Sequence, residues 1–217
     1  MKSFLYVCII SLCTHFLYAQ TFSSKVYFSE QIASYINVYQ YKIGKAKAAR
    51  DYQKVADLYN EFINQKLVGS YLDDFNIDCF DRKKNNLGDF DKPLVLLTYA
   101  DWCKSLENEI FIFNRKVEEL HKKIDFLVLL WGDKRQARKL KKLFHNKSKI
   151  LYVNALRNRD EHTIRMLKHA LGVPTIIMTN ADKKIKSIIK VTPAFPNLYE
   201  YDFEKELVRN LKTLNID

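Results

Sequence analysis

Residues 92–103 read KPLVLLTYADWC, and this stretch decides how the rest of the chain is arranged. The uninterrupted apolar run that begins at Leu94 predicts a strand buried on both faces. A helical pattern over residues 104–122 follows the Trp102-Cys103 pair at once. Cys103 is therefore expected in the first turn of a helix, where unpaired N–H groups and the helix dipole favour an anion. A thiolate in such a place can have a pKa below the free-thiol value of about 8.5.

Strand and helix patterns alternate after this stretch, as expected for an α/β domain with neighbouring parallel strands. In chain order, the sequence predicts a buried strand at 123–131, a basic helix at 133–145, a short strand at 149–156, a helix at 159–171, a hairpin of TIIMT (175–179) and KIKSIIKV (184–191), and a helix at 200–214. The hairpin makes the predicted sheet mixed.

A helical extension precedes this domain. Apolar residues recur at helical spacing in two stretches, Ser29–Tyr41 and Ala48–Leu67, and Gly44 is expected to separate them into an αα-hairpin. From Gly69 the pattern changes to alternation ending at Cys79, followed by turn-forming residues. We therefore divide the chain into a signal peptide (1–19), a helical extension (20–66) and an α/β domain (67–217).

The first nineteen residues, MKSFLYVCIISLCTHFLYA, have a basic start, an apolar middle and a small residue at the end. This layout predicts a secretory signal peptide cleaved after Ala19. Removing it takes two of the four cysteines, which leaves Cys79 and Cys103 in the mature protein. We expect a periplasmic or secreted protein in a compartment where disulfides persist. The alternative is a membrane anchor formed by an uncleaved signal.

The chain carries a formal net charge of +11, concentrated in residues 134–149. A nucleic-acid patch is one interpretation. An apolar stripe at helical spacing runs between these charges and favours instead a helix with a solvated basic face; it consists of Ala137, Leu140, Leu143 and Phe144. We expect no nucleic-acid partner.

Three motifs, in this order, resemble a known family. They are LVGSYLDDFNIDCFDRKKNNLGDFDKP (67–93), KPLVLLTYADWC (92–103) and GVPT (172–175). Together they are similar to thioredoxin-like proteins, and in particular to the exported redoxin/TlpA-like disulfide reductases. The resemblance covers about residues 67–214. It implies a thioredoxin-like fold, with a mixed central sheet flanked by helices, and a role in thiol–disulfide exchange.

The resemblance also implies roles for individual residues. Cys103 would be the nucleophile, and Lys104 could help to hold its thiolate by charge. Trp102 would shape a substrate groove together with Pro174, whose peptide bond would be cis. The groove would offer backbone contacts to an extended substrate strand; they would come from Val173 and from the N–H group of Thr175.

One departure from the family pattern leaves the mechanism open. Leu106 stands where the second, resolving cysteine is usual, so a mixed disulfide on Cys103 cannot be resolved internally in the ordinary way. Cys103 could act alone, with an external thiol as reductant, or with Cys79 as a disulfide partner. Alternatively, the domain could be a non-catalytic module that binds a protein in the Trp102/Pro174 groove. The expected partner is a thiol- or disulfide-bearing protein or a small thiol, and no metal or other cofactor is expected.

Overall fold

A computed structural model of the protein describes residues 25–75, 78–80, 86–103, 106–153, 165–191 and 201–215. The expected signal peptide lies outside these residues. The helices are α2 (Phe28–Ala48), α3 (Tyr52–Phe62), α4 (Glu107–Leu120), α5 (Lys134–Leu140) and α7 (Phe203–Leu211), and the strands are β1 (Asp78–Cys79), β2 (Leu94–Ala100), β3 (Asp125–Trp131), β4 (Lys149–Val153), β5 (Thr175–Thr179) and β6 (Ile185–Lys190). Short helical turns are η1 (Ile63–Leu67), η2 (Leu87–Asp89), η3 (Lys141–Leu143), η4 (Arg165–Ala170) and η5 (Lys212–Leu214).

The strands form one mixed sheet in the order β1-β4-β3-β2-β5-β6. β2, β3 and β4 are parallel to one another, whereas β1, β5 and β6 each run antiparallel to a neighbour. The predicted mixed sheet is confirmed. β2 lies in its interior, which explains why its sequence is apolar without alternation.

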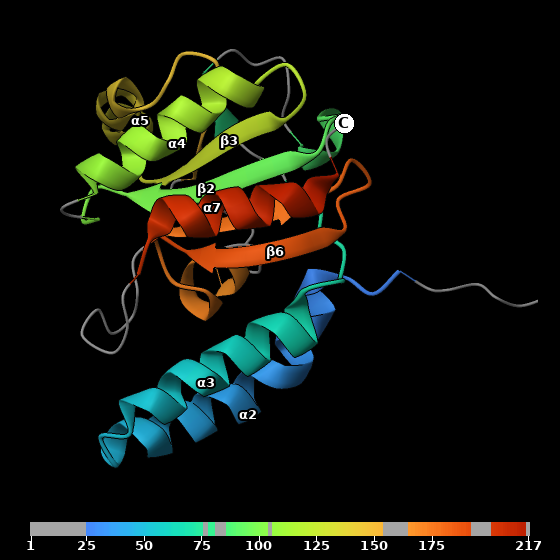
Figure 1. Ribbon diagram of the computed structural model, residues 1–217, viewed down its shortest axis with the longest axis vertical. Coiled ribbons are helices and arrows are strands. Elements are labelled where there is room, and N and C mark those ends of the chain that lie inside the picture. The colour runs from blue at the N-terminus through green and yellow to red at the C-terminus, as the bar shows by residue number, and fades with distance from the viewer. Residues whose placement is uncertain are drawn as a thin grey trace, which may run out of the picture.

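Successive residues of the central strands point to opposite faces of the sheet and enter two separate cores. Leu94 and Leu96 of β2 join the core that α2, η1 and η4 help to form, whereas Val95 and Leu97 join the core of α4, α5 and α7. Figure 1 shows α4 and α7 lying across the sheet, with α2 and α3 side by side beyond β6. Helical elements therefore cover both faces.

The helical extension is an αα-hairpin, but its turn is not at Gly44. α2 continues through Gly44 to Ala48, and the chain reverses at Arg50, which adopts a left-handed conformation with φ of 56°. Asp51 then caps α3, because its side chain accepts a hydrogen bond from the Lys54 N–H at 2.9 Å. A helix tolerates an isolated glycine at a cost of about 1 kcal/mol, so Gly44 alone did not stop α2.

The extension shares a core with the α/β domain. Four of its buried apolar side chains belong to the same cluster as β2 and β3; they are Phe28, Ile32, Phe62 and Ile63. Beyond η1, residues 69–72 run along the outer side of β6. Gly69 donates a backbone hydrogen bond to Ile185 at 2.9 Å, and Ile185 donates one to Ser70 at 2.8 Å.

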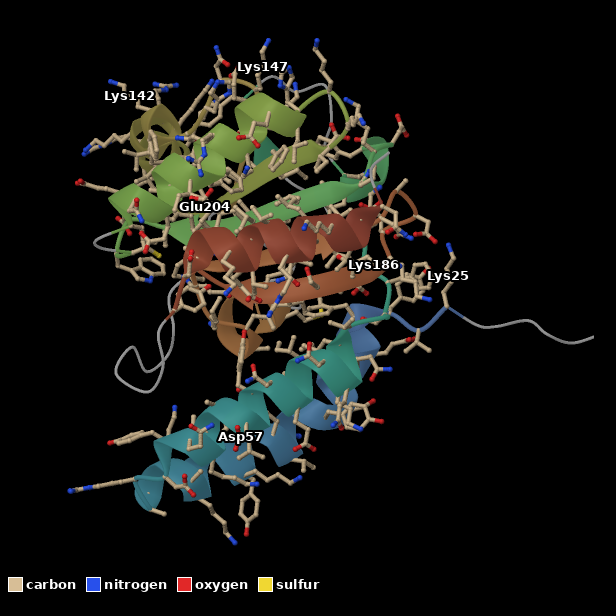
Figure 2. The ribbon with its side chains drawn as sticks, in the orientation of Figure 1. Lys25, Asp57, Lys142, Lys147, Lys186 and Glu204 are labelled. Atoms are coloured by element: carbon tan, nitrogen blue, oxygen red, sulfur yellow. The ribbon has the colours of Figure 1, made fainter. Side chains whose placement is uncertain are left out.

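Two further expectations change in detail. The chain reaches Phe90 through the helical turn η2, and residues 81–85 before this turn lie outside the described part. The basic helix α5 ends at Leu140, and of its predicted stripe Ala137 is buried whereas Leu143 is 44% exposed. In Figure 2, Lys142 and Lys147 project from this side of the molecule, away from the α2/α3 hairpin.

Candidate functional site around Cys103

Cys103 lies in the connection between β2 and α4. β2 ends at Ala100, and the Cys103 N–H donates a hydrogen bond to the Ala100 carbonyl at 3.0 Å. α4 begins only at Glu107. The expectation that Cys103 occupies the first turn of a helix is therefore wrong, because this turn at the end of β2 comes before the helix.

The surroundings of Cys103 act on its thiol in opposite directions. The residue is half-buried and packs against both cores at the end of the sheet. Burial raises the pKa of the Cys103 thiol above its ordinary value, and the Asp101 carboxylate adds to this, whereas a hydrogen bond with the Ala100 backbone and the Lys190 ammonium act to lower it. Burial dominates, so the predicted lowered pKa is also wrong for this structure.

Tyr99 of β2 contacts the cysteine loop, the connection between β2 and α4 that carries Cys103. Its hydroxyl donates a hydrogen bond to the carbonyl oxygen of Cys103 at 3.1 Å, and its side chain is only 5% exposed. Burial raises the pKa of Tyr99, with a smaller contribution from Cys103. Tyr99 therefore stays protonated and can donate this bond at neutral pH. The sequence analysis did not single it out.

Trp102 presents an open aromatic surface beside the cysteine. The residue is 53% exposed. The Lys168 ammonium lies 5.1 Å from the centre of its ring and 5.7 Å from that of Trp131, so one cation contacts both indoles. Trp131 pairs with Ala100 at the carboxyl end of β3, next to the cysteine loop.

The loop before β5 runs beside the cysteine loop. Thr98 pairs with Thr175, so the residues that follow β2 lie alongside those that precede β5. The peptide bond between Val173 and Pro174 is cis, and Val173 packs against the same core cluster as Cys103. Within the described part of the chain, neither the N–H nor the carbonyl group of Val173 has a hydrogen-bond partner. These two groups can therefore pair with an added strand.

Thr175 does not offer the N–H group that the sequence analysis expected. This N–H donates a hydrogen bond to Thr98 Oγ1 at 3.1 Å, and the Thr175 hydroxyl donates one to the Gly172 carbonyl at 2.8 Å. Thr98 Oγ1 in turn donates to the Thr175 carbonyl at 3.2 Å. Both threonines are fully buried. Thr175 thus holds the loop, and the backbone groups of this segment that stay unpaired among the described residues are those of Val173.

The remaining predicted site residues are placed as follows. Lys104 lies outside the described residues, and Leu106 is 3% exposed, packed in the core with α4. Cys79 pairs with Leu151 of β4, and β4 and β3 both intervene between its strand and β2. Three strand spacings amount to about 14 Å, whereas a disulfide requires Cα atoms within about 7 Å of each other. A bond between Cys79 and Cys103 therefore needs the backbone to move.

Lys190 is a site residue that the sequence analysis missed. It pairs with Thr175 across β5 and β6, and its ammonium donates a hydrogen bond to the carbonyl of Leu171, just before the cis-proline loop. Burial lowers the pKa of Lys190 to about 8, against a smaller opposing contribution from Cys103. No local pattern distinguishes this lysine from its neighbours, because only strand register brings it here.

The described ranges offer neither a metal site nor a membrane span. They contain no group of three or more histidine, cysteine, aspartate or glutamate side chains placed to hold a metal ion. No helix within them combines the length and the apolar character needed to cross a membrane.

Comparison with solved structures decides the fold. The protein is similar to a thio-disulfide isomerase from Thermus thermophilus, with a TM-score of 0.51, 19% identity, and coverage of 69% of this chain and 98% of the other. The chain has a thioredoxin-like fold. The same fold occurs in a protein assigned as a disulfide isomerase from Bacteroides thetaiotaomicron (TM-score 0.52, 16% identity, 68% and 89% covered). It occurs also in a protein assigned as the thiol:disulfide interchange protein DsbE from Chlorobium tepidum (TM-score 0.50, 15% identity, 68% and 97% covered).

No protein-family model matches the sequence, and no curated protein matches it. The thioredoxin-like fold is therefore recognised from the structure and from the motifs around Cys103 and Pro174.

Proposed function

We propose that this protein acts in thiol–disulfide exchange through Cys103 as a single nucleophile. The observation that carries the proposal is the juxtaposition of a half-exposed thiol, an exposed indole at Trp102 and the Val173 backbone, which is unpaired among the described residues. Solved structures with the same fold include a thio-disulfide isomerase, which supports a redox role.

The chemistry needs no cofactor. The Cys103 thiolate attacks one sulfur of a partner disulfide, a new S–S bond forms, and the other sulfur leaves as a thiolate. The partner chain would lie beside Val173 as an added strand and would be held by its backbone N–H and carbonyl groups. Because Leu106 supplies no second thiol, an external thiol then attacks the mixed disulfide and releases Cys103 in its reduced form.

The electrostatics of the site make this exchange dependent on pH. Burial keeps the Cys103 thiol protonated at neutral pH, while the Lys190 ammonium opposes it. Since only the thiolate attacks, the rate rises with pH until Cys103 has titrated. Docking of a partner disulfide against Trp102 would bring an exchangeable sulfur close to a thiol that reacts slowly with small reagents.

We propose further that the protein acts after export. The basic, apolar and small-residue layout of residues 1–19 supports a cleaved signal. The partner would then be a disulfide-bearing protein or a small thiol in an oxidising compartment.

Reaction with oxidised glutathione tests the nucleophile. We expect a glutathione mixed disulfide on Cys103, identified by peptide mass spectrometry, that forms faster as pH rises and is reversed by added reduced glutathione. Cys79→Ser is the matched control and should react at the wild-type rate. Absence of the adduct from Cys103 in folded protein would exclude the exchange mechanism.

A non-catalytic binding module is the second candidate, and the raised pKa of Cys103 favours it. Trp102 and the Val173 backbone would then form a protein-binding groove without chemistry. This alternative predicts that Trp102→Ala weakens capture of a partner from the exporting compartment, whereas Cys103→Ser leaves capture unchanged. The exchange mechanism predicts that Cys103→Ser abolishes every captured species that a reductant releases.

A further inference from the structure

A cleft separates the α2/α3 hairpin from the side of the domain formed by β6 and α7. Its volume is about 940 Å³, and its inner end is lined by Leu171, Gly172 and Lys190. Neither Cys103 nor Trp102 lines it. This volume lies at the upper end of the range of roughly 300–1,000 Å³ that is usual for small-molecule sites. The cleft is therefore a second candidate site, which shares Lys190 with the cysteine site but does not include Cys103.

Two hydroxyl groups in the wall of this cleft lack hydrogen-bond partners among the described residues. They are Tyr59 Oη of α3 and Ser187 Oγ of β6, and both oxygens are buried from solvent. Ser187 as a whole is only 7% exposed. Buried hydroxyls are nearly always paired, because leaving one unpaired costs free energy. Tyr59 lies beside Lys190 in the cleft, so an occupant there can supply the polar atom that the Tyr59 hydroxyl lacks. Ser187 is three residues from Lys190 along β6 and therefore points to the opposite face of the sheet.

The charge of the cleft is predominantly positive. Lys190 places its ammonium 5.5 Å from the centre of the Tyr59 ring, so it lies next to one of the unpaired hydroxyl-bearing side chains. Lys47 and Arg209 also line the cleft. Glu206 is the acidic lining residue, and its carboxylate contacts Arg209 at 2.7 Å. Three cations against one paired carboxylate favour an anionic occupant.

The rest of the wall is apolar or aromatic. Tyr39 stacks on Phe62 with ring centres 4.2 Å apart, and the Tyr39 ring faces the cleft together with Tyr201. Aliphatic side chains from both the hairpin and the domain complete the lining; they include Ile36, Ile43, Val55, Ile63, Ile188 and Ile189. Such a surface requires an occupant whose body is itself apolar.

We propose that this cleft binds a small amphipathic organic anion, with its charged oxygens at Lys190 and Tyr59 and its apolar body between the hairpin and β6. The Tyr59 hydroxyl and the Lys190 ammonium supply hydrogen-bond donors, as a carboxylate or sulfonate group requires. This inference does not depend on thiol chemistry at Cys103. It assigns the helical extension a role as one wall of a ligand site.

A pair of fluorescent probes that differ in charge tests the proposal on the full-length protein. The anion is 8-anilinonaphthalene-1-sulfonate, and the neutral analogue N-phenyl-1-naphthylamine lacks the sulfonate. We expect the anion to bind at one saturable site and the neutral analogue at least tenfold more weakly. Equal affinity for the two probes, or no saturable binding of the anion, would overturn the proposal without any mutation.

Variants locate the bound anion. Lys190→Met keeps an apolar stem and should weaken anion binding at least tenfold, and Tyr59→Phe, which removes only the hydroxyl, should weaken it severalfold. Lys186→Met is the matched control on the same strand, because Lys186 does not line the cleft, and it should bind like wild type. Urea titration checks that each variant is folded. Unchanged affinity in folded Lys190→Met and Tyr59→Phe would place the anion elsewhere and refute the assignment.

Discussion

Cys103 owes its expected reactivity to a balance between burial and one neighbouring cation. Because burial raises the pKa of its thiol, we expect alkylation by iodoacetamide to be slow at neutral pH and to have its midpoint above the free-thiol value of about 8.5. Lys190 is charged below about pH 8 and opposes burial there, so Lys190→Met should slow alkylation further at neutral pH. Mass spectrometry of the Cys103 peptide across a pH series measures both effects.

Lys186→Met again serves as the control, since it removes a lysine of β6 that does not figure among the influences on the Cys103 thiol. Fast alkylation of wild-type Cys103 at pH 7 would contradict this prediction. It would show that the first turn after β2 stabilises the thiolate more than burial destabilises it.

Lys190 should also make stability depend on pH. Its pKa is about 8 in the folded protein, against about 10.4 for a free lysine in the unfolded chain. Between these values the unfolded chain binds more protons, so the free energy of unfolding rises with pH. Below about pH 8 both states are protonated, and the contribution of Lys190 stays at its lowest.

Urea titrations of wild type and Lys190→Met at pH 7, 9 and 10 measure this contribution. We expect the stability of wild type to rise relative to the variant as pH increases. Two curves that stay parallel over this range would show that the Lys190 ammonium is not desolvated in the folded state.

At the scale of elements, the Thr98–Thr175 hydrogen bonds join β2 to β5, and their contribution to stability can be measured. Thr98→Val keeps the shape of the side chain but leaves the buried N–H of Thr175 without its acceptor. An unsatisfied buried donor costs about 1–3 kcal/mol, so the free energy of unfolding should fall by that amount. Thr98→Ser restores the hydroxyl and should recover most of the loss. A fully stable Thr98→Val protein would mean that the Thr175 N–H finds another acceptor.

Element types were predictable from the sequence, whereas element ends and contacts across strands were not. The apolar run of β2 and the helical spacing of α7 are local signals, and both elements were predicted. The chain reverses after α2 through a left-handed conformation at Arg50. Arginine adopts this conformation rarely, and no sequence motif predicts it here. The acceptor of the Thr175 N–H is Thr98, 77 residues away, so the role of Thr175 follows only from strand register.

At the scale of the whole molecule, the extension and the domain share one core, and we propose that they unfold together. Phe62 of α3 is 4% exposed and belongs to the core that includes β2 and β3. Phe62→Ala should lower the free energy of unfolding by about 3–5 kcal/mol. Far-UV circular dichroism, which reports the helices, and tryptophan fluorescence, to which buried Trp131 of β3 contributes, should give coincident transitions.

Phe111→Ala provides the control, because Phe111 is 65% exposed and its truncation should change stability by less than about 0.5 kcal/mol. A loss of helical signal before any change in fluorescence would separate the hairpin from the domain. The division of the chain at residue 66 would then be a boundary in folding as well as in sequence.

Residues 69–72 also cover part of a sheet edge that could otherwise support self-association of the protein. β6 is an edge strand, and an uncovered edge of this kind is a template for strands of other molecules. The hydrogen bonds of Gly69 and Ser70 with Ile185 occupy the first part of that edge. A protease that cut this segment and released it would therefore do more than shorten the chain: it would open the edge of β6 to pairing between molecules, and the clipped protein should aggregate.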